Sequence, residues 1–471
     1  MLCSSSPRAD AACSRMLSEV VTARIDRFIA DRSRALPGYG VAVAGGADAG
    51  FPQVMMHGFP EAVCWRRPSR RLAVLRQILT YHNPHLALTR PPLPGRERMK
   101  VRVKVVLRCR VGQAMAGLVV DNVSVFFLAE GEQTADEVMV RLTTFIRASK
   151  RTLDFAIYDM RFSDPLHAQL AAALRERAGA GVKIRFCYDA DKPFSPNVAA
   201  GQDPAPSGTG AFVQSLGYPW RRIAGMKLMH SKFIVRDGQS VWAGSANMTD
   251  DAFTLMENNI VEIDSQALAN HYAEDFEQLW EKENFENTGQ IRTQPVAVSF
   301  AGKPAEVRVM FSPGCGLEID SEIARRVRAA QRRVRICSLL INSGTLINEL
   351  GNLLRHGAVA VDGIYDRTQM EQVYVQWQEV PSNRWKIGAL EEIIARAGLI
   401  GKNSTPYSAT GRHNYMHNKV LVIGDTVITG SYNFSRSAQF NAENILFVES
   451  APLANTYSAY IDHLKSKYAA Y

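Results

Sequence analysis

The sequence has little of what marks membrane-spanning, disulfide-rich or zinc-binding proteins. No run of about 18 apolar residues occurs anywhere in the chain, so no membrane-spanning helix is expected. The seven cysteines are an odd number, lie far apart and never form a CxxC spacing. This pattern predicts reduced, unpaired thiols and argues against a disulfide framework or a zinc site.

Excess positive charge is also missing from most of the chain. The formal net charge is +9, but residues 1–122 hold 19 Lys and Arg against 8 Asp and Glu, which is +11. The remaining residues therefore hold 36 against 38, or −2. Net charge thus gives no argument for nucleic-acid binding by the larger part of the chain, although a local phosphate site is compatible with it.

We interpret residues 1–122 as a basic, partly disordered N-terminal extension. It contains one pattern typical of a short helix, at residues 16–32, and a segment from Met99 in which Val alternates with Lys and Arg. The second segment favours an edge strand over a signal sequence, because Arg108 and Arg110 interrupt its apolar centre. The extension either meets anionic lipid or nucleic acid, or precedes a translation start at Met99.

From residue 123 the chain alternates strand-like and helix-like segments, and it does so twice. The paired strand segments are VSVFF and VRVMF, then TLDFAIY and VRICSLLI, then VKIRFCYD and VAVDGIYD. Such alternation predicts an α/β fold with two similar α/β/α sandwich halves, mainly parallel sheets and a pseudo-twofold axis between the halves. We expect a first half at 123–285, a linker at 286–306 and a second half at 307–471.

Helix starts are marked after the first strand of each half. Thr134 and Glu137 form a capping-box sequence, with Thr134 as the N-cap. In the second half, Asp320 or Ser321 is expected to cap the matching helix.

Each half then carries strongly polar residues in an apolar hairpin, in the stretches MHSKFIVRDGQSVWAGSAN and MHNKVLVIGDTVITGSYN. A glutamate follows each hairpin, in MENN and in AENI. Two copies of so particular a pattern are not expected by chance. The repeated residues are His230, Lys232, Gly244, Ser245, Asn247 and Glu257 in the first copy, and His417, Lys419, Gly430, Ser431, Asn433 and Glu443 in the second.

The repeated residue types suit a phosphodiester. Side chains two apart in a strand point to the same face, so each half directs an imidazole and an ammonium the same way. Two lysines and two asparagines would stabilise charge on phosphate oxygens, and Ser245 and Ser431 would add substrate-binding hydroxyls. One imidazole attacks phosphorus, while the opposite one protonates the leaving alcohol and later activates water.

The doubled HxK(x)4D…GSxN pattern resembles that of the phospholipase D superfamily, over residues 123–471. The resemblance implies that His230 is the nucleophile, that His417 is the general acid and base, and that no metal or other cofactor takes part. It further implies phosphate ligands, carboxylates that orient the histidines, and the motif aspartate. These are Lys232, Lys419, Asn247 and Asn433, then Glu257 and Glu443, then Asp237.

The second copy departs from the pattern at its turn. The place that matches Asp237 holds Gly424, with Asp425 one residue later, and the second hairpin is one residue shorter. Because both DG and GD suit tight hairpins, we expect Asp425 to shape the turn and the site to remain competent.

The function predicted is a phospholipase D-type phosphodiesterase that hydrolyses the headgroup phosphodiester of phospholipids through a covalent phosphohistidine. The alternatives are a metal-independent nuclease cutting DNA or RNA, and a non-catalytic module that binds phosphodiesters. A phospholipid or a membrane surface is the expected partner, with nucleic acid as the alternative. We expect a monomer that is soluble, in the cytoplasm or peripheral to a membrane, with secretion left open.

Several residues have two interpretations at this stage. Aromatic residues in 212–220 and 374–380 either meet acyl chains or pack in the core. The strand-end residues Asp189 and Asp366 either contact a ligand or cap helices. Arg412 and His413 either touch substrate or lie in a solvated loop. A metal site of His230, Asp237, His417 and Asp425 has suitable composition, but the neighbouring lysines would repel a cation.

Overall fold

The computed structural model describes strands β1 and β2 and residues 121–189, 208–357, 359–408 and 411–469. The chain divides into two compact units, Met1–Ala114 and Met115–Tyr471. In the first unit, β1 (Gly40–Ala44) and β2 (Gln53–His57) pair antiparallel. The helix expected at 16–32 and the strand expected from Met99 lie outside the described residues.

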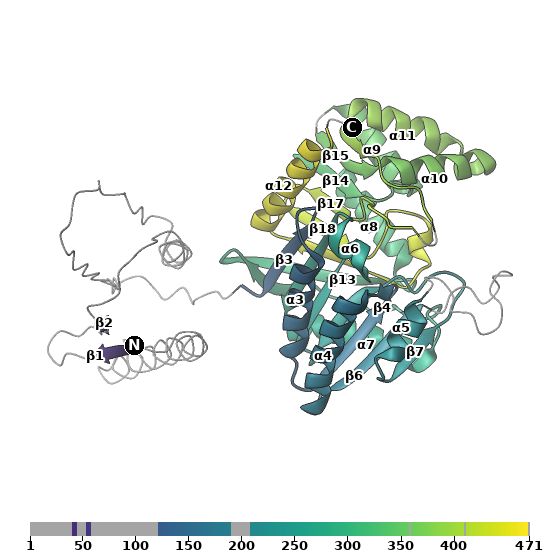
Figure 1. Cartoon of the computed structure of the whole chain (residues 1–471). Coiled ribbons are helices and arrows are strands. Elements are labelled where there is room, and N and C mark those ends of the chain that lie inside the picture. The colour runs from purple at the N-terminus through teal and green to yellow at the C-terminus, as the bar shows by residue number, and fades with distance from the viewer. Residues whose placement is uncertain are drawn as a thin grey trace, which may run out of the picture. The chain divides into compact units, whose positions relative to one another are not determined.

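The second unit contains two large sheets, one in each half (Figure 1). The first sheet has seven strands in the order β3-β11-β9-β8-β4-β6-β7. Its strands are β3 (Val123–Leu128), β4 (Thr152–Ile157), β6 (Lys183–Asp189), β7 (Trp220–Ile223), β8 (Lys232–Arg236), β9 (Ser240–Gly244) and β11 (Asn258–Asp264). A short parallel pair, β5 (Met160–Arg161) with β10 (Met248–Thr249), lies outside this sheet.

The second sheet repeats this order and adds a strand at one edge. It has eight strands in the order β12-β13-β19-β18-β17-β14-β15-β16. Its strands are β12 (Val296–Phe300), β13 (Lys303–Ser312), β14 (Arg333–Ser338), β15 (Ala360–Asp366), β16 (Gly398–Lys402), β17 (Lys419–Ile423), β18 (Thr426–Gly430) and β19 (Glu443–Glu449). The segment 286–306, expected to be a linker, thus contains β12 and the start of β13.

The predicted α/β class with two similar halves is confirmed. Parallel pairing is found at one side of each sheet, among β4, β6 and β7 and among β14, β15 and β16. The other pairs are antiparallel, so both sheets are mixed. The reason is local: each His/Lys hairpin and the strand after it follow one another through short connections, which antiparallel strands allow.

Helices cover both faces of each sheet. The first half contains α3 (Ala135–Arg147), α4 (Asp164–Gly179), α5 (Thr209–Ser215), α6 (Asp250–Thr254) and α7 (Gln266–Lys282). The second contains α8 (Gly316–Arg328), α9 (Gly344–His356), α10 (Arg367–Glu379), α11 (Trp385–Arg396) and α12 (Ala451–Tyr468), with 3-10 turns η1 (Pro381–Asn383) and η2 (Ser437–Gln439). One continuous apolar core joins α7, α12 and one face of both sheets, so the two halves share their interior.

Each sheet has a further core on its opposite face. Helices α3 and α4 pack there in the first half, and α8, α9 and α11 in the second. The capping box predicted at α3 is confirmed, because Thr134 and Glu137 bond each other's backbone N–H groups. The cap predicted for the second half is wrong: α8 begins at Gly316, which places Asp320 and Ser321 inside the helix.

The described part of the chain bears on two expectations from the sequence, one about the cysteines and one about membrane-spanning helices. Cys187, Cys315 and Cys337 are free thiols, and all three are buried. Among the described helices, none combines the length and the hydropathy that membrane crossing requires.

Candidate active site

Two equivalent hairpins carry the repeated polar residues. In the first, Arg236 of β8 pairs with Ser240 of β9, which leaves residues 237–239 in the turn. In the second, Ile423 of β17 pairs with Thr426 of β18, which leaves only residues 424 and 425. The shorter second turn read from the sequence is therefore confirmed, and Gly424 supplies its positive φ of 57°.

Asp237 lies outside the site. It follows the end of β8, whereas His230 precedes the start of that strand. The Asp237 carboxylate accepts the backbone N–H groups of Lys150 (2.8 Å), Arg151 (2.6 Å) and Thr152 (3.0 Å). The assignment of Asp237 to the catalytic set is therefore wrong: it anchors the start of β4. Asp425 also lies at its turn, 2.5 Å from Arg332, as expected for a turn residue.

The glycine of each GSxN is required by a close approach of backbones. Gly244 and Gly430 have φ values of 133° and 146°, a region that side-chain-bearing residues rarely adopt. A Cβ atom on either glycine would lie 2.3 Å from a carbonyl oxygen, that of Asn259 or Asn444. This approach lets the N–H of the following serine bond the same carbonyl, at 3.0 Å in both halves.

His230 is held by the opposite half of the molecule. Its Nδ1 lies 2.8 Å from Oε2 of Glu443, and its backbone N–H donates to the carbonyl of Ala442 at 2.8 Å. The other oxygen of Glu443 accepts a bond from the side chain of Asn441 at 2.9 Å. An ionised carboxylate can only accept a hydrogen bond, so when Glu443 is ionised Nδ1 of His230 carries the hydrogen and Nε2 is left for chemistry.

His417 is held in the same way but by a neutral partner. Its Nδ1 lies 2.9 Å from Oδ1 of Asn258, in the first half. The amide nitrogen of Asn258 donates to the carbonyl of Ala252 at 3.2 Å, and its oxygen accepts from the Ser245 hydroxyl at 2.8 Å. These bonds fix the amide with its oxygen toward the imidazole, so Nδ1 of His417 is again the donor.

Strand pairing shows why Asn258 holds this place. The glycine of each hairpin pairs with an isoleucine on the following strand, Ile260 in the first half and Ile445 in the second. Two residues before these isoleucines lie Asn258 and Glu443, so the two side chains occupy equivalent positions. Matching Glu257 with Glu443 by residue type, as the sequence suggests, places the first copy one residue out of register with the second.

Glu257 is consequently not a partner of His417. Its structural counterpart in the second half is Ala442, and its fully buried carboxylate lies 2.6 Å from Nζ of Lys402. The assignment of Glu257 as a histidine-orienting carboxylate is therefore wrong, whereas Glu443 does contact His230.

The two motif serines lie beneath the histidines. Both are fully buried. The hydroxyl of Ser245 donates to Asn258, and that of Ser431 bonds the Glu443 carboxylate. Their prediction as substrate-binding residues is wrong, because each hydroxyl is bonded to the side chain that holds a histidine.

The two lysines occupy one space with the histidines. Nζ of Lys232 donates to the carbonyl of His230 at 2.8 Å, and Nζ of Lys419 to that of His417 at 2.6 Å. Burial lowers the pKa of Lys232 to about 7. The pKa of Lys419 lies well below its usual range because of burial and because of the charge of Lys232.

The other ionisable groups respond to the same burial. Both His230 and His417 have pKa values well below the usual range, first through burial and then through the charges of both lysines. Burial raises the pKa of Glu443 to about 8. These shifts describe a site in which isolated charges are costly, so an anion between the lysines would favour their charged forms.

Asn247 and Asn433 are the equivalent asparagines of the two GSxN motifs. In each, the buried side-chain oxygen has no hydrogen-bond partner among the described residues. Buried amides are almost always bonded, and here the exception occurs at the same place in both halves. This pair is what a polar ligand at the site would satisfy.

Two aspartates that the sequence left open hold the segments leading into the histidines. The Asp189 carboxylate accepts the N–H of Met229 at 2.7 Å, and that of Asp366 accepts the N–H of Met416 at 2.9 Å. Asp366 also caps α10 through the N–H of Gln369. The repeated Tyr-Asp at the strand ends was the sequence signal for these positions.

Tyr158 was not singled out as a site residue. Its ring centroid lies 4.6 Å from that of His230, and Nζ of Lys232 lies 4.9 Å from the same ring. The matching position in the second half is Leu339, because the backbone N–H groups of both residues bond equivalent carbonyls. The two sides of the site are therefore lined differently.

The remaining candidates lie elsewhere. The aromatic side chains of 212–220 pack against the first outer core, and Trp377 lies in the second and donates to Asn342 at 3.1 Å. Their core interpretation is the correct one. Arg412 binds Asp251 at 3.2 Å, and the ring of His413 stacks between two tyrosines. Within the described ranges, no group of three or more His, Cys, Asp or Glu residues is placed to hold a metal ion.

Comparison with known families bears on this arrangement. The family model described as "Cardiolipin synthase, PLD-like domain" matches residues 142–280 and 323–465, one segment in each half. The chain belongs to the phospholipase D superfamily. The two matched segments include both hairpins and the strands that follow them, so the doubled phospholipase D-like pattern corresponds to two copies of one domain.

Individual relatives agree with this membership. The phospholipase D-like chain is 30% identical over 147 residues to a mitochondrial cardiolipin hydrolase of Xenopus laevis, and 29% identical over 147 residues to that of Xenopus tropicalis. Each match covers 31% of this chain and 63% of the relative, so the chain spans less than two thirds of these relatives' length. A phosphatidylserine synthase of Haemophilus influenzae shares the fold at 14% identity, with a TM-score of 0.50 over 72% of this chain and 87% of that one.

Proposed function

We propose that this phospholipase D-like chain hydrolyses the headgroup phosphodiester of a phospholipid through a phosphohistidine at His230. The observation that carries the proposal is the crossed pairing of the histidines. Each imidazole is oriented through Nδ1 by a side chain of the opposite half, Glu443 for His230 and Asn258 for His417. Two buried lysines lie in the same space.

In the first step, Nε2 of His230 attacks phosphorus and the bond from phosphorus to the headgroup oxygen breaks. His417, protonated when the anionic phosphodiester is bound beside it, gives its Nε2 proton to that oxygen, so the headgroup leaves as a neutral alcohol. Lys232 and Lys419, with the amides of Asn247 and Asn433, stabilise the charge on the remaining phosphate oxygens. The product of this step is phosphatidyl-His230.

In the second step, water enters where the alcohol left. His417, now neutral, takes a proton from the water as its oxygen attacks phosphorus. The N–P bond breaks, and the electron pair returns to Nε2 of His230. Phosphatidic acid leaves, and both imidazoles have recovered their starting protonation.

The unlike partners of the histidines support this division of roles. An ionised Glu443 stabilises the positive charge that forms on His230 as the N–P bond forms. The oxygen of Asn258 carries no net charge, so protonated His417 is less stabilised and gives up its proton more readily. We therefore assign nucleophilic attack to His230 and proton transfer to His417.

Cardiolipin is the first lipid to test, because the curated relatives bear the name cardiolipin hydrolase. Vesicles of cardiolipin, phosphatidylglycerol or phosphatidylcholine would be offered in EDTA, in parallel with labelled single-stranded DNA and RNA. We expect phosphatidic acid from at least one lipid with the wild type and none with His230→Ala. EDTA is expected to leave the rate unchanged, because lysines take the place of a metal cation in this chemistry.

The alternatives give different results in the same assay. Cleavage of DNA or RNA with lipid left intact would make the protein a nuclease. Binding of vesicles or nucleic acid without any cleavage would make it a binding module. Quenching in alkali, in which the N–P bond survives, is expected to leave label on His230 when the substrate is radiolabelled at phosphorus, and label on His417 would reverse the two roles.

A further inference from the structure

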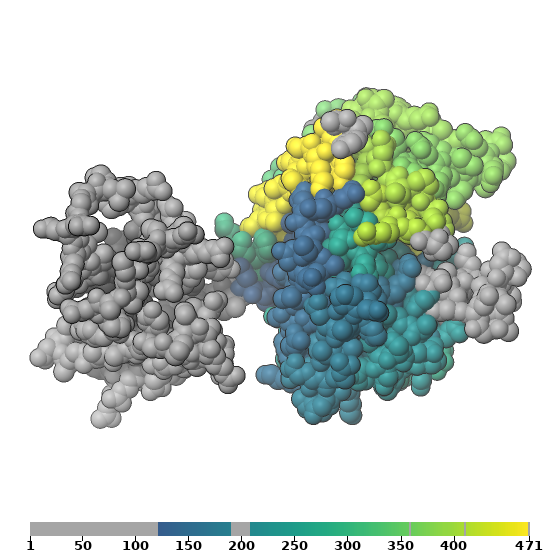
Figure 2. Space-filling view, viewed as in Figure 1, coloured from purple at the N-terminus to yellow at the C-terminus, as the bar shows by residue number. Residues whose placement is uncertain are grey.

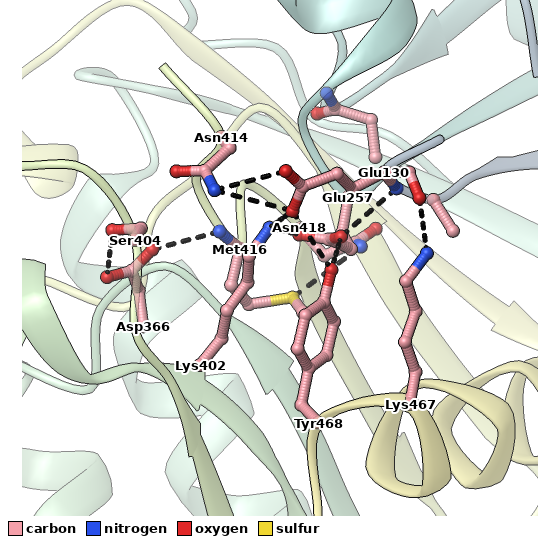
Figure 3. Close-up of polar contacts among 12 residues, drawn as sticks. Glu130, Glu257, Asp366, Lys402, Ser404, Asn414, Met416, Asn418, Lys467 and Tyr468 are labelled. Carbon is pink, nitrogen blue, oxygen red and sulfur yellow. Dashed lines mark hydrogen bonds and ion pairs between the residues drawn. The ribbon is translucent and has the colours of Figure 1, made fainter. Parts of the chain in front are cut away.

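A group of ionisable residues surrounds the buried carboxylate of Glu257 and takes no direct part in the proposed chemistry (Figure 3). The carboxylate of Glu257 binds Nζ of Lys402 at 2.6 Å, the hydroxyl of Tyr468, and the backbone N–H of Glu130 at 3.2 Å. Lys402 is 1% exposed and lies 3.0 Å from the carboxylate of Glu130 as well. We call these four residues the Glu257 cluster.

The cluster exists in only one half. The structural counterpart of Glu257 is Ala442, whose side chain cannot accept a hydrogen bond. The first histidine is thus held without such a group, while the second has a carboxylate, an ammonium and a phenol added beside it. Stability alone is a weak reason for this addition, since a buried ion pair seldom stabilises more than apolar residues of similar volume.

The cluster is connected to His417 on both sides. The backbone N–H of Glu257 donates to the carbonyl of Tyr415 at 3.1 Å, and Glu257 forms an isolated parallel β-bridge with Met416. The residue after Glu257 is Asn258, which accepts the Nδ1–H of His417 at 2.9 Å. A shift of Glu257 would therefore move both the segment that leads into His417 and the amide that orients its ring.

The members of the cluster come from distant parts of the chain. Lys402 ends β16, Tyr468 ends α12, and Glu130 follows β3. Lys467, next to Tyr468 in α12, also binds the carboxylate of Glu132 at 2.9 Å, so the end of α12 is joined to the segment after β3 by a further ion pair. In the space-filling view, the yellow helix α12 lies directly against the dark blue start of the first half (Figure 2).

We propose that Glu257, held by Lys402 and Tyr468, is a positioning group for His417 in proton transfer to the leaving alcohol. This role rests on the function proposed above and adds a contribution from the last turn of α12. The cluster touches neither substrate nor the reacting nitrogen. It holds Asn258 and residues 415–417 so that Nε2 of His417 meets the leaving oxygen.

The test uses the fact that a good leaving group needs no proton. Two substrates would share the same phosphatidyl group, one with an alkyl alcohol and one with p-nitrophenol as the leaving group. In a single turnover, Tyr468→Phe and Glu257→Gln are expected to slow release of the alkyl alcohol, which reports the first step alone, by about tenfold or more, a fraction of what full loss of general acid catalysis costs. For release of p-nitrophenol in the same first step we expect less than a twofold change, with substrate binding unchanged for both.

Tyr457→Phe is the matched control, because it also removes one buried hydroxyl from α12. That hydroxyl donates to the side-chain oxygen of Asn259 at 3.1 Å and lies outside the Glu257 cluster. The variant is expected to leave both rates unchanged. His417→Ala sets the limit, with a large loss of first-step rate for the alkyl substrate only. Thermal melting would identify variants that fail to fold, and Tyr468→Phe, which deletes one oxygen, keeps the test available if Glu257→Gln does not fold.

Two outcomes would overturn the positioning role while leaving the proposed function intact. Equal losses of first-step rate for both substrates would show a general structural role, and unchanged first-step rates for both would show that the cluster does not affect His417. If the wild type cleaved neither substrate, the proposed function would fail, and the positioning role would fail with it.

Discussion

The two histidines of the site differ chiefly in what accepts their Nδ1–H. Glu443 and Asn258 occupy equivalent positions, yet one is a carboxylate and the other an amide. This difference cannot alter the shape of the site much, because both acceptors lie at similar distances. It alters how well each imidazole tolerates a positive charge.

Glu443→Gln tests this difference directly. The variant keeps the side-chain length but removes the charge that stabilises a forming phosphohistidine. We expect adduct formation to slow by about a hundredfold or more, with substrate binding little changed. Rapid alkaline quench of a single turnover with phosphorus-labelled substrate measures this rate, and an adduct that still forms at the wild-type rate would contradict the role given to Glu443.

The pH profile should report Lys232. Burial lowers its pKa to about 7, and in the proposed mechanism the protonated form binds phosphate. The required charge is present below that pKa and lost above it, so kcat/KM is expected to fall as pH rises through about 7. Arginine stays protonated, so Lys232→Arg should shift the fall to higher pH in whatever activity remains. A wild-type profile that stays flat up to about pH 9 would contradict this assignment.

Asp237→Ala should separate stability from catalysis. The Asp237 carboxylate accepts three backbone N–H groups at the start of β4, at the far end of β8 from His230. Its loss is expected to lower the free energy of unfolding by about 1–3 kcal/mol. Urea denaturation measures the cost, and kcat of the folded variant should match the wild type. A large loss of kcat would return Asp237 to the catalytic set.

At the scale of elements, the two hairpins could be read from the sequence because their signals are local. Apolar alternation, tight-turn residues and the repeated His-x-Lys all lie within about twenty residues of each other, and each was found where expected. The strand after each hairpin was harder. Its register depends on which residue pairs with the GSxN glycine, and that pairing is set by backbone approach rather than by residue type.

Glu257 and Asn258 show the limit of such reading. A glutamate occurs after each hairpin, but the structurally equivalent residues are Asn258 and Glu443, which differ in type. Neighbouring side chains in a strand point to opposite faces. Glu257 precedes Asn258 by one residue, so it lies on the face opposite to Asn258 and is not part of the site. Sheet direction was misjudged for a related reason, because apolar runs alone do not distinguish parallel from antiparallel burial.

Gly430→Ala should be costly for a reason that belongs to the hairpin. The added Cβ would lie 2.3 Å from the Asn444 carbonyl, and φ is 146°. We expect the free energy of unfolding to fall by about 1–3 kcal/mol from backbone strain alone. Gly388→Ala in α11 is the control, because nothing lies near its added Cβ, and it should stabilise slightly. Equal effects of the two changes would refute the close-approach argument.

At the scale of the whole molecule, one chain supplies everything that the proposed reaction needs. Both histidines, both lysines and the side chains that orient them lie in the unit Met115–Tyr471. The shared core between the sheets fixes the halves together without a second chain.

Mixing two inactive variants tests this arrangement. His230→Ala removes the nucleophile and His417→Ala removes the general acid and base, so neither chain alone can complete the proposed reaction. If every site is completed within one chain, mixing the two proteins should restore no activity, and wild-type rate should rise linearly with concentration. Recovery of activity on mixing would show that sites form between chains.

The crossing of Glu443 and Asn258 between the halves also has an evolutionary consequence. A lone ancestral half could complete its site only as a symmetric pair, in which both imidazoles necessarily had the same acceptor. Once two copies were fused in one gene, each could mutate independently. A carboxylate in one copy and an amide in the other is a difference that two copies in one chain can carry and a symmetric pair of identical chains cannot, and the same holds for the Glu257 cluster.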